Sequence, residues 1–94
     1  ENVYRLQIMN TLEQPQRYEV SVSGLQGLTI ASEPVIEVDS AAARWLAVRV
    51  QLPPEVAEPL RGQSNPIEFR IDRQPLGGEA VRSVHEKSTF LVPR

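Results

Sequence analysis

The chain has few side chains that could bind a metal or act in catalysis. Cysteine is absent from its 94 residues, and His85 is the one histidine. A thioether sulfur and an imidazole nitrogen could together hold copper, so Met9 and His85 form the candidate pair. In the alternative interpretation His85 is a solvated side chain, since it lies in a polar stretch with Arg82, Glu86 and Lys87. We favour the solvated histidine.

Catalysis by serine or by carboxylates is not indicated. No serine has the sequence context of a hydrolase nucleophile, and a pair of catalytic carboxylates needs a cleft that so small a domain rarely forms. The densest acidic group is Glu33, Glu37 and Asp39, and its spacing does not match a calcium-binding loop. We interpret this group as a charged, solvated edge. The sequence therefore predicts no catalytic, cofactor-binding or metal-binding residue.

Trp45 and the arginines near it are the best candidates for a binding surface. Arg44 precedes the tryptophan, and Arg49 follows four residues later. Tryptophan and arginine are enriched at the centres of protein interfaces, so Arg44, Trp45 and Arg49 form the predicted partner surface. In the alternative interpretation Trp45 covers the end of the hydrophobic core, and the arginine stems lie over it.

Charge and composition exclude several classes of protein. Apolar residues make up 40% of the chain and charged residues 23%, as in folded soluble domains. The net charge is −2 and the arginines are scattered, whereas nucleic-acid binding needs clustered positive charge. No apolar run approaches the ~20 residues of a membrane-spanning helix, so we expect no membrane insertion by this chain. It opens at Glu1 without a signal peptide, and we interpret it as a fragment or a mature product.

Alternation of apolar and polar residues predicts the elements that position these side chains. It marks segments near 4–8, 17–23, 28–30, 35–38, 44–52, 67–71 and 80–84, and a last one at Phe90 and Val92. Breakers separate these segments at intervals of about ten residues, and no long helix is indicated. Residues 1–94 are therefore expected to form one all-β domain, an antiparallel β-sandwich of about seven strands.

Turn-forming residues add further expectations. The first two strands, joined by residues 10–16, are expected to pair with each other in antiparallel fashion. Residues 55–65 form a proline-punctuated connection, and residues 74–78 form a turn. Asp39 and Ser40, followed by three alanines, could instead cap a short helix, but the β-branched residues beyond them favour a strand.

The predicted sandwich differs from antibody domains in what holds its sheets together. Antibody domains pack a buried tryptophan on a disulfide between the sheets. This chain has no cysteine, and Trp45 is out of phase with the apolar residues Leu46, Val48 and Val50. We therefore expect Trp45 to face outward or to lie at the strand's start, with aliphatic packing alone holding the sheets.

Three stretches, taken in order, resemble a known family. They are residues 2–10 (NVYRLQIMN) continuing through 18–25 (YEVSVSGL), residues 66–71 (PIEFRI), and residues 86–93 (EKSTFLVP). Over essentially the whole chain they resemble the C-terminal immunoglobulin-like domain of the FixG/CcoG family, accessory proteins of cbb-type haem–copper oxidases. The resemblance implies an immunoglobulin-like sandwich at the end of a larger membrane protein.

The resemblance also implies what the parent protein does. Family members are inner-membrane proteins with cysteine-ligated 4Fe–4S clusters, and they are implicated in copper handling, with reduction of Cu(II) to Cu(I), during oxidase assembly. The domain is then expected on the periplasmic face, with an oxidase subunit, a copper carrier or the parent's own membrane part as partner. None of the cluster cysteines lies in this chain, so no catalytic residue carries over.

Functions of different classes stay open on the sequence. The one we favour is a non-catalytic interaction module. The alternatives are a transient copper-binding domain that uses Met9 and His85, and a sugar-binding or adhesion sandwich unrelated to FixG.

Overall fold

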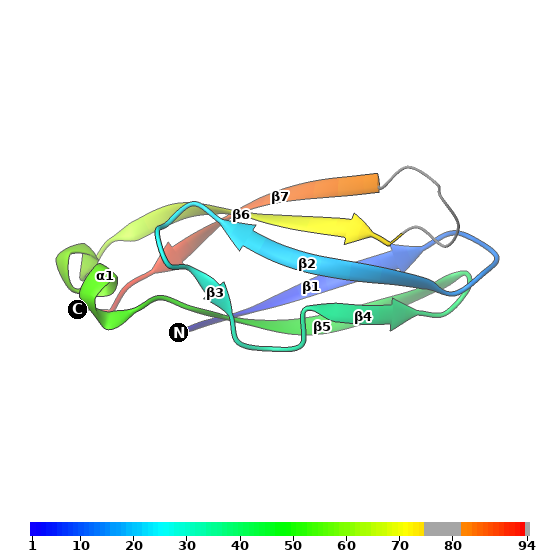
Figure 1. The fold of residues 1–94 in the computed structure, drawn as a ribbon, viewed down its shortest axis with the longest axis horizontal. Helices are drawn as coiled ribbons and strands as arrows, with labels where there is room; N and C mark the ends of the chain where they lie inside the picture. The colour runs from blue at the N-terminus through cyan, green and yellow to red at the C-terminus, as the bar shows by residue number, and fades with distance from the viewer. Residues whose placement is uncertain (75–81, 94) are drawn as a thin grey trace.

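Two antiparallel sheets make up the computed structural model, which describes residues 1–74 and 82–93 (Figure 1). The three-stranded sheet has the order β1 (Asn2–Asn10), β5 (Ala42–Gln51), β3 (Thr29–Ile30). The four-stranded sheet has the order β4 (Val35–Val38), β2 (Gln16–Ser23), β6 (Ser64–Arg73), β7 (Arg82–Leu91). The predicted all-β sandwich of about seven strands is confirmed. Residues 75–78 of the turn predicted at 74–78, and residues 80 and 81 of the strand predicted at 80–84, fall outside the described residues.

The core lies between the sheets, where the alternating apolar side chains of both sheets meet. Its buried members are Ile8, Val20, Ile36, Val38, Val48, Val50, Ile67, Phe69, Phe90 and Val92. Phe69 packs edge-to-face on Tyr4, with ring centroids 5.0 Å apart. The expectation of purely aliphatic packing is therefore wrong, because two phenylalanines and a tyrosine also join the sheets.

The expected pairing of the first two strands is wrong. β1 pairs along its whole length with β5, from Asn2 opposite Val50 to Asn10 opposite Ala42. β2 lies in the other sheet, between β4 and β6. The segment between β1 and β2 thus crosses from one sheet to the other. Alternation identifies a strand and its buried face, but it does not say which edges meet.

Asn10 fixes this crossover from a buried position. Its side-chain amide donates hydrogen bonds to the carbonyl oxygens of Gln14, Val38 and Asp39 at 2.9, 3.1 and 3.1 Å. Its side-chain oxygen accepts one from the Leu12 N–H at 3.0 Å. Because Val38 belongs to β4, the asparagine at the end of β1 also ties the two sheets together.

The chain between β5 and β6, predicted as a proline-punctuated connection, contains two short helical segments. A four-residue helix, α1 (Pro54–Ala57), is followed by a 3₁₀ turn, η1 (Glu58–Leu60). Pro54 occupies the first helical position, where its missing N–H and fixed φ are tolerated. No helix follows Asp39 and Ser40, since the chain turns there and enters β5. Among the described residues, no helix has the length and apolar character needed to span a membrane.

The final strand is continuous where the sequence indicated two segments. β7 runs from Arg82 to Leu91 and pairs with β6 throughout. Residues 83–87 are all exposed, on either side of this edge strand. Because neither face is buried there, burial imposes no apolar alternation, and the pattern fades in the middle of the strand.

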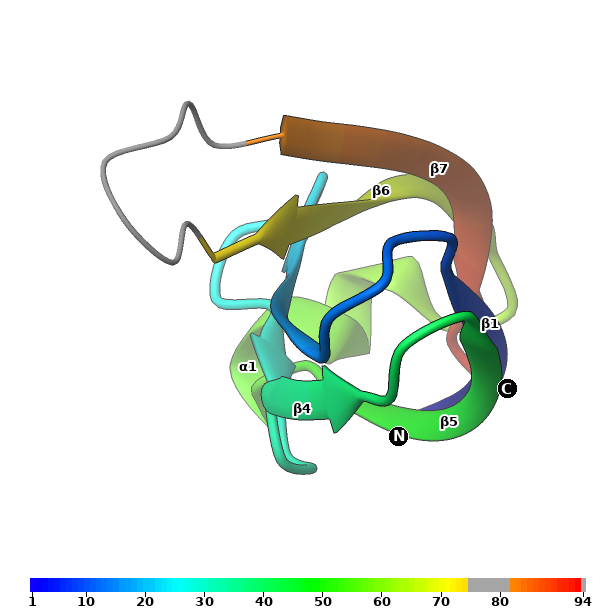
Figure 2. The ribbon, with the colours of Figure 1, turned by 90° about the vertical axis from the view of Figure 1, so that its right-hand side faces the viewer.

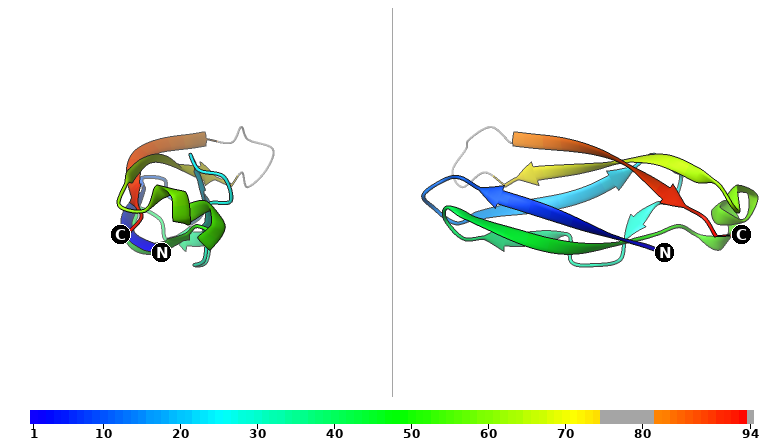
Figure 3. Two further views of the ribbon diagram at one scale, coloured as in Figure 1. Left: turned by 90° about the vertical axis from the view of Figure 1, so that its left-hand side faces the viewer. Right: turned by 180° about the vertical axis from the view of Figure 1, so that it is seen from behind.

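Side chains of β1 join the two sheets at the end that carries both chain termini (Figure 3). The Asn2 amide donates to the Leu91 carbonyl at 2.9 Å, and its oxygen accepts from the Leu91 N–H at 3.2 Å. The Tyr4 hydroxyl donates to the Thr89 carbonyl at 2.6 Å, and burial raises the pKa of that hydroxyl. Figure 2 shows β7 diverging from β1 toward the opposite end.

Candidate binding surfaces

The outer face of the three-stranded sheet gathers exposed apolar side chains. We call it the Trp45 face, and its members are Val3, Arg5, Gln7 and Met9 of β1 and Ala43, Trp45, Ala47, Arg49 and Gln51 of β5. Trp45 is 63% exposed, Met9 65% and Val3 60%. Trp45 does not pack on the core, so the alternative in which it covers the core's end does not hold.

Charge is distributed unequally between the two sheets. The strands of the three-stranded sheet contain Arg5, Arg44 and Arg49 and no aspartate or glutamate. The acidic residues of the described strands all lie in the four-stranded sheet: Glu19, Glu37, Glu68, Asp72 and Glu86. At the margin of the Trp45 face, the Glu1 carboxylate accepts a 2.6 Å hydrogen bond from the Gln51 side-chain amide. The face is therefore apolar and cationic although the chain is net acidic.

The structure separates the three residues of the predicted partner surface. Trp45 and Arg49 share the Trp45 face, and the Arg49 guanidinium also reaches the Ala31 carbonyl at 3.3 Å. Arg44 has the opposite orientation along β5, and its Nη1 donates to the Glu37 carbonyl of β4 at 3.0 Å. Arg44 therefore links the two sheets at their margin and does not belong to the face.

Sequence reasoning missed the contribution of β1 to this surface. Gln7 of β1 lies directly opposite Trp45 of β5. Met9 lies opposite Ala43 and is therefore a diagonal neighbour of Trp45. The alternation of β1 already placed Val3, Arg5 and Met9 on one side of a strand. The missing information was that this strand pairs with the one that carries Trp45.

The candidate copper ligands Met9 and His85 face away from the molecule on different sheets. Met9 belongs to the Trp45 face, whereas His85 lies opposite Arg70 on the outer side of the four-stranded sheet. The His85 Nδ1 is 2.7 Å from a carboxylate oxygen of Glu68. In the part of the chain that the structure describes, no three His, Cys, Asp or Glu side chains form a group that could hold a metal ion. The structure thus does not assemble the pair.

The acidic group Glu33, Glu37 and Asp39 lies at the β4 edge of the four-stranded sheet. The side chains of these residues are in solvent. Glu37 faces Arg17 of β2 across 3.7 Å, an exposed pair that contributes about 0–1 kcal/mol. The arrangement agrees with a charged, solvated edge.

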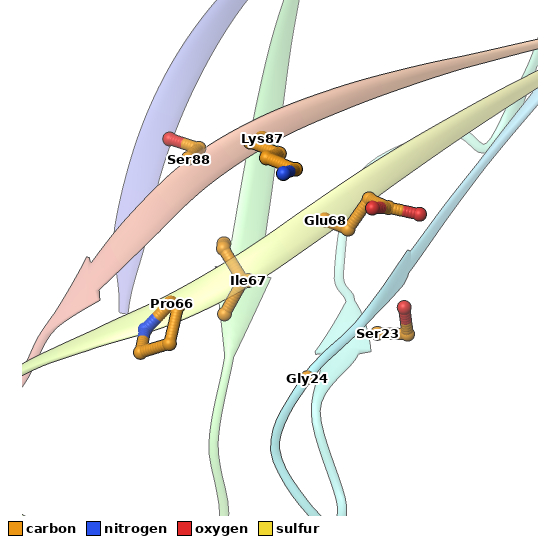
Figure 4. Close-up of a pocket in the computed structure, with 7 residues that line it drawn as sticks. All are labelled: Ser23, Gly24, Pro66, Ile67, Glu68, Lys87 and Ser88. Atoms are coloured by element: carbon orange, nitrogen blue, oxygen red, sulfur yellow. The ribbon is translucent and has the colours of Figure 1, made fainter.

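A depression of about 370 Å³ lies over Gly24, where β2 approaches β6 (Figure 4). It is lined by Ser23, Gly24, Pro66, Ile67, Glu68, Lys87 and Ser88. A β-carbon at Gly24 would lie 2.7 Å from the Pro66 carbonyl oxygen, so the close contact of the two strands needs glycine there. The Glu68 carboxylate beside the depression already contacts His85.

Asp72 links β6 to β7 through a small polar network. It accepts hydrogen bonds from the Ser83 hydroxyl and from Arg70 Nε, the latter at 2.9 Å. Arg70 also donates to the Ser83 hydroxyl at 3.4 Å. The hydrogen bonds from Ser83 and Arg70 hold the pKa of the Asp72 carboxyl below its ordinary value of 3.8.

The depressed pKa of Asp72 gives a testable dependence of stability on pH. The ionised carboxyl stabilises the fold above pH 3.8, and this contribution is lost as the pH falls through the folded-state pKa. We expect Asp72→Asn to be less stable than wild type near neutral pH and the difference to shrink in acid, as measured by urea unfolding across pH. Asp39→Asn, whose carboxylate has no partner among the described residues, is the control. A difference that does not change with pH would contradict this assignment.

The fold and its surfaces define an immunoglobulin-like β-sandwich that presents an apolar, cationic sheet face. Residues 1–93 match the family model described as "IG-like fold at C-terminal of FixG", with FixG itself given there as a proposed oxidoreductase. The chain belongs to this family of FixG C-terminal domains, as the sequence resemblance implied.

A solved structure supports the same fold. The crystal structure of a FixG-related protein from Vibrio parahaemolyticus is similar with a TM-score of 0.69 and 20% sequence identity, over 99% of this chain and 78% of that one. The comparison with curated proteins found no match.

Proposed function

We propose that this domain is a non-catalytic interaction module of a FixG-type iron–sulfur membrane protein, and that the Trp45 face binds a protein partner. In this proposal the redox chemistry belongs to 4Fe–4S clusters elsewhere in the parent, which handles copper during assembly of a cbb-type oxidase. The domain lies on the periplasmic face of the inner membrane. Family membership supports the kind of parent protein, and the Trp45 face carries the proposal of a binding role.

The composition of the Trp45 face favours contact with another protein. Trp45, Met9 and Val3 are each more than half exposed on one sheet face, and the small Ala43 and Ala47 lie on either side of Trp45 along β5. Contiguous apolar surface of this kind marks interaction sites in soluble domains. Tryptophan and arginine contribute most of the binding energy in many interfaces. Arg5, opposite Ala47, and Arg49, opposite Val3, lie on the same face, on the Val3 side of Trp45.

The charge of the face indicates what the partner presents. Arg5 and Arg49 lie on strands without a carboxylate, so a partner with carboxylates around an apolar centre is complementary. An oxidase subunit, a copper carrier and the parent's own membrane part are the candidates. Of the two arginines, Arg49 is held in place by its bond to the Ala31 carbonyl, whereas Arg5 has no partner among the described residues.

Replacing Trp45 by alanine is expected to weaken partner binding about 30-fold, as for a residue at an interface centre that contributes about 2 kcal/mol. The parent protein is produced in its own membranes with a photo-crosslinking amino acid at Ala47, and the adducts are identified by mass spectrometry. Recovery of a defined oxidase subunit, copper carrier or parent segment, lost with Trp45→Ala, supports the proposal.

The matched control is Val35→Ala, because Val35 is an exposed apolar residue on the other sheet. It should leave the adducts unchanged, and both variants should keep the wild-type melting temperature within a few degrees. Adducts to lipid alone, or adducts unaffected by Trp45→Ala, would refute the Trp45 face as the interface. Protease added to spheroplasts should cleave the domain if it is periplasmic.

A further inference from the structure

The outer edge of β7 carries backbone groups that no strand pairs. The Leu91 N–H and C=O both bond to the Asn2 side chain, so the Leu91 backbone points away from β6. The β6–β7 register is uninterrupted from Ser64 opposite Leu91 to Arg73 opposite Arg82. Because alternate residues of an edge strand point outward, the backbone groups of Ser83, His85 and Lys87 also face away from β6. No described residue bonds to them.

β1 has a free edge of the same kind, and it lies on the side of β7. The Arg49 N–H bonds to the Ser32 hydroxyl, and the Arg49 C=O bonds to the Ala31 N–H, so this residue of β5 points away from β1. In the regular β1–β5 register, the residue opposite Arg49 is Val3. The backbone groups of Val3 and its alternates Arg5, Gln7 and Met9 therefore point away from β5.

Between these two edges lies a groove that opens into the core. It has a volume of about 430 Å³ and is lined by Gln7, Ile8, Met9, Thr11, Tyr18, Ile71, Arg73 and Val84. Val84 lies opposite Ile71 and is on the same side of β7 as the buried Phe90, yet it is 58% exposed. β7 diverges from β1 (Figure 2), and the exposure of Val84 indicates that no described residue covers this part of the inner face of the four-stranded sheet.

We propose that this groove binds an extended segment of a partner protein, which adds to the free edge of β7 as a further strand. The backbone of the segment pairs with Ser83, His85 and Lys87, and its alternate apolar side chains cover Val84 and Ile71. This site shares Gln7 and Met9 with the Trp45 face but uses neither Trp45 nor Arg49, and it stands whether or not that face is an interface.

The regular spacing of the unpaired backbone N–H and C=O groups along β7 favours a peptide strand as the ligand over a small molecule. Donors and acceptors recur along β7 at every second residue, about 7 Å apart, and the backbone of an extended chain presents partners at the same interval. The apolar floor of Ile8, Tyr18 and Ile71 suits the side chains on one side of such a strand.

Two unpaired cations indicate the charge of the segment. Lys87 lies on the edge strand β7 and Arg5 on the edge strand β1, and neither has an ion-pair partner among the described residues. Glu86 is the one acid in β7. A partner segment with a carboxylate among the side chains that face solvent therefore complements the charge of Lys87 and Arg5.

The test uses the ¹⁵N-labelled protein and a short peptide that alternates valine with threonine and includes one glutamate. At millimolar peptide, we expect saturable shifts of the amide signals of Ser83, His85 and Lys87 that exceed those of Val84 and Glu86. A peptide of the same sequence, N-methylated on the amides that face the edge, should bind at least about tenfold more weakly.

Lys87 provides a matched pair of variants. Lys87→Pro removes an outward N–H without removing a ladder hydrogen bond, so the edge strand should persist while peptide affinity falls at least about tenfold. Lys87→Ala keeps the N–H and removes the charge, and it should change affinity by less than about threefold. The amide spectrum reports whether each variant is folded.

Several results would overturn the proposal. These are equal binding of the N-methylated peptide, no saturable shift with the unmethylated one, and equal affinities for Lys87→Pro and Lys87→Ala with both variants folded. If Lys87→Pro is unfolded, His85→Pro tests the same edge at the next outward N–H. Shifts that depend on protein concentration without peptide would assign the edge to a second copy of the chain and refute a partner segment.

Discussion

Replacing Asn10 by alanine is expected to lower the free energy of unfolding by about 3 kcal/mol. The substitution leaves the carbonyls of Gln14, Val38 and Asp39 without their amide donor and the Leu12 N–H without its acceptor. Asn10 is 2% exposed, so water cannot replace these bonds without a rearrangement. A domain of this length has a total stability of about 5–14 kcal/mol, so the loss should be large in a urea titration.

Asn65→Ala is the control for Asn10→Ala. Asn65 is also largely buried, at 8% exposure, but its amide makes two bonds of 3.3 Å, to Gln63 and Phe90. We expect a loss of about 1 kcal/mol. If Asn10→Ala cost no more than Asn65→Ala, Asn10 would not be the residue that holds the crossover between the sheets.

Gly24→Ala is expected to destabilise the domain by about 3 kcal/mol as well. Gly24 has a φ of 126°, a conformation that costs other residues about 1–3 kcal/mol. The added β-carbon would also lie 2.7 Å from the Pro66 carbonyl oxygen and 2.9 Å from the Ile67 Cα. Both contacts are with backbone, so β2 and β6 must separate locally, at a further cost of about 1–3 kcal/mol.

Gly62→Ala separates the cost of the backbone conformation at Gly24 from the cost of the close contact between β2 and β6. Gly62 has a φ of 75°, and its N–H bonds to the Val92 carbonyl at 2.8 Å, a bond that alanine preserves. The left-handed conformation alone should cost about 1 kcal/mol. Equal losses of unfolding free energy in the two variants would mean that the close approach of β2 and β6 at Gly24 is unimportant.

The strands could be predicted from sequence because burial of one face imposes alternation. β5 shows this clearly, with Leu46, Val48 and Val50 turned inward and Trp45 outward. The pairing of the strands could not be predicted in the same way. It depends on the segment after Asn10, whose residues are turn formers in either a hairpin or a crossover. The bonds that decide between them are to Val38 and Asp39, far along the chain.

The same limit applies to the candidate surfaces. Alternation places Trp45 and Arg49 on one side of one strand, whereas Arg44 joins the predicted partner surface only through its nearness in sequence. The sequence offers Met9 as a candidate metal ligand, and only the β1–β5 register shows that it is a neighbour of Trp45. The groove beside β7 could not be predicted, since a free edge is a property of the whole sheet order.

The bonds from Asn2 and Tyr4 to the last strand have a mechanical consequence. Both chain ends lie at the same end of the molecule, where Asn2 bonds to Leu91 (Figure 3). Tension between the two ends would therefore load these bonds one after another, starting at Asn2 and continuing to Tyr4, instead of all together. The domain should yield by peeling at low force, and each step would lengthen the groove between β1 and β7.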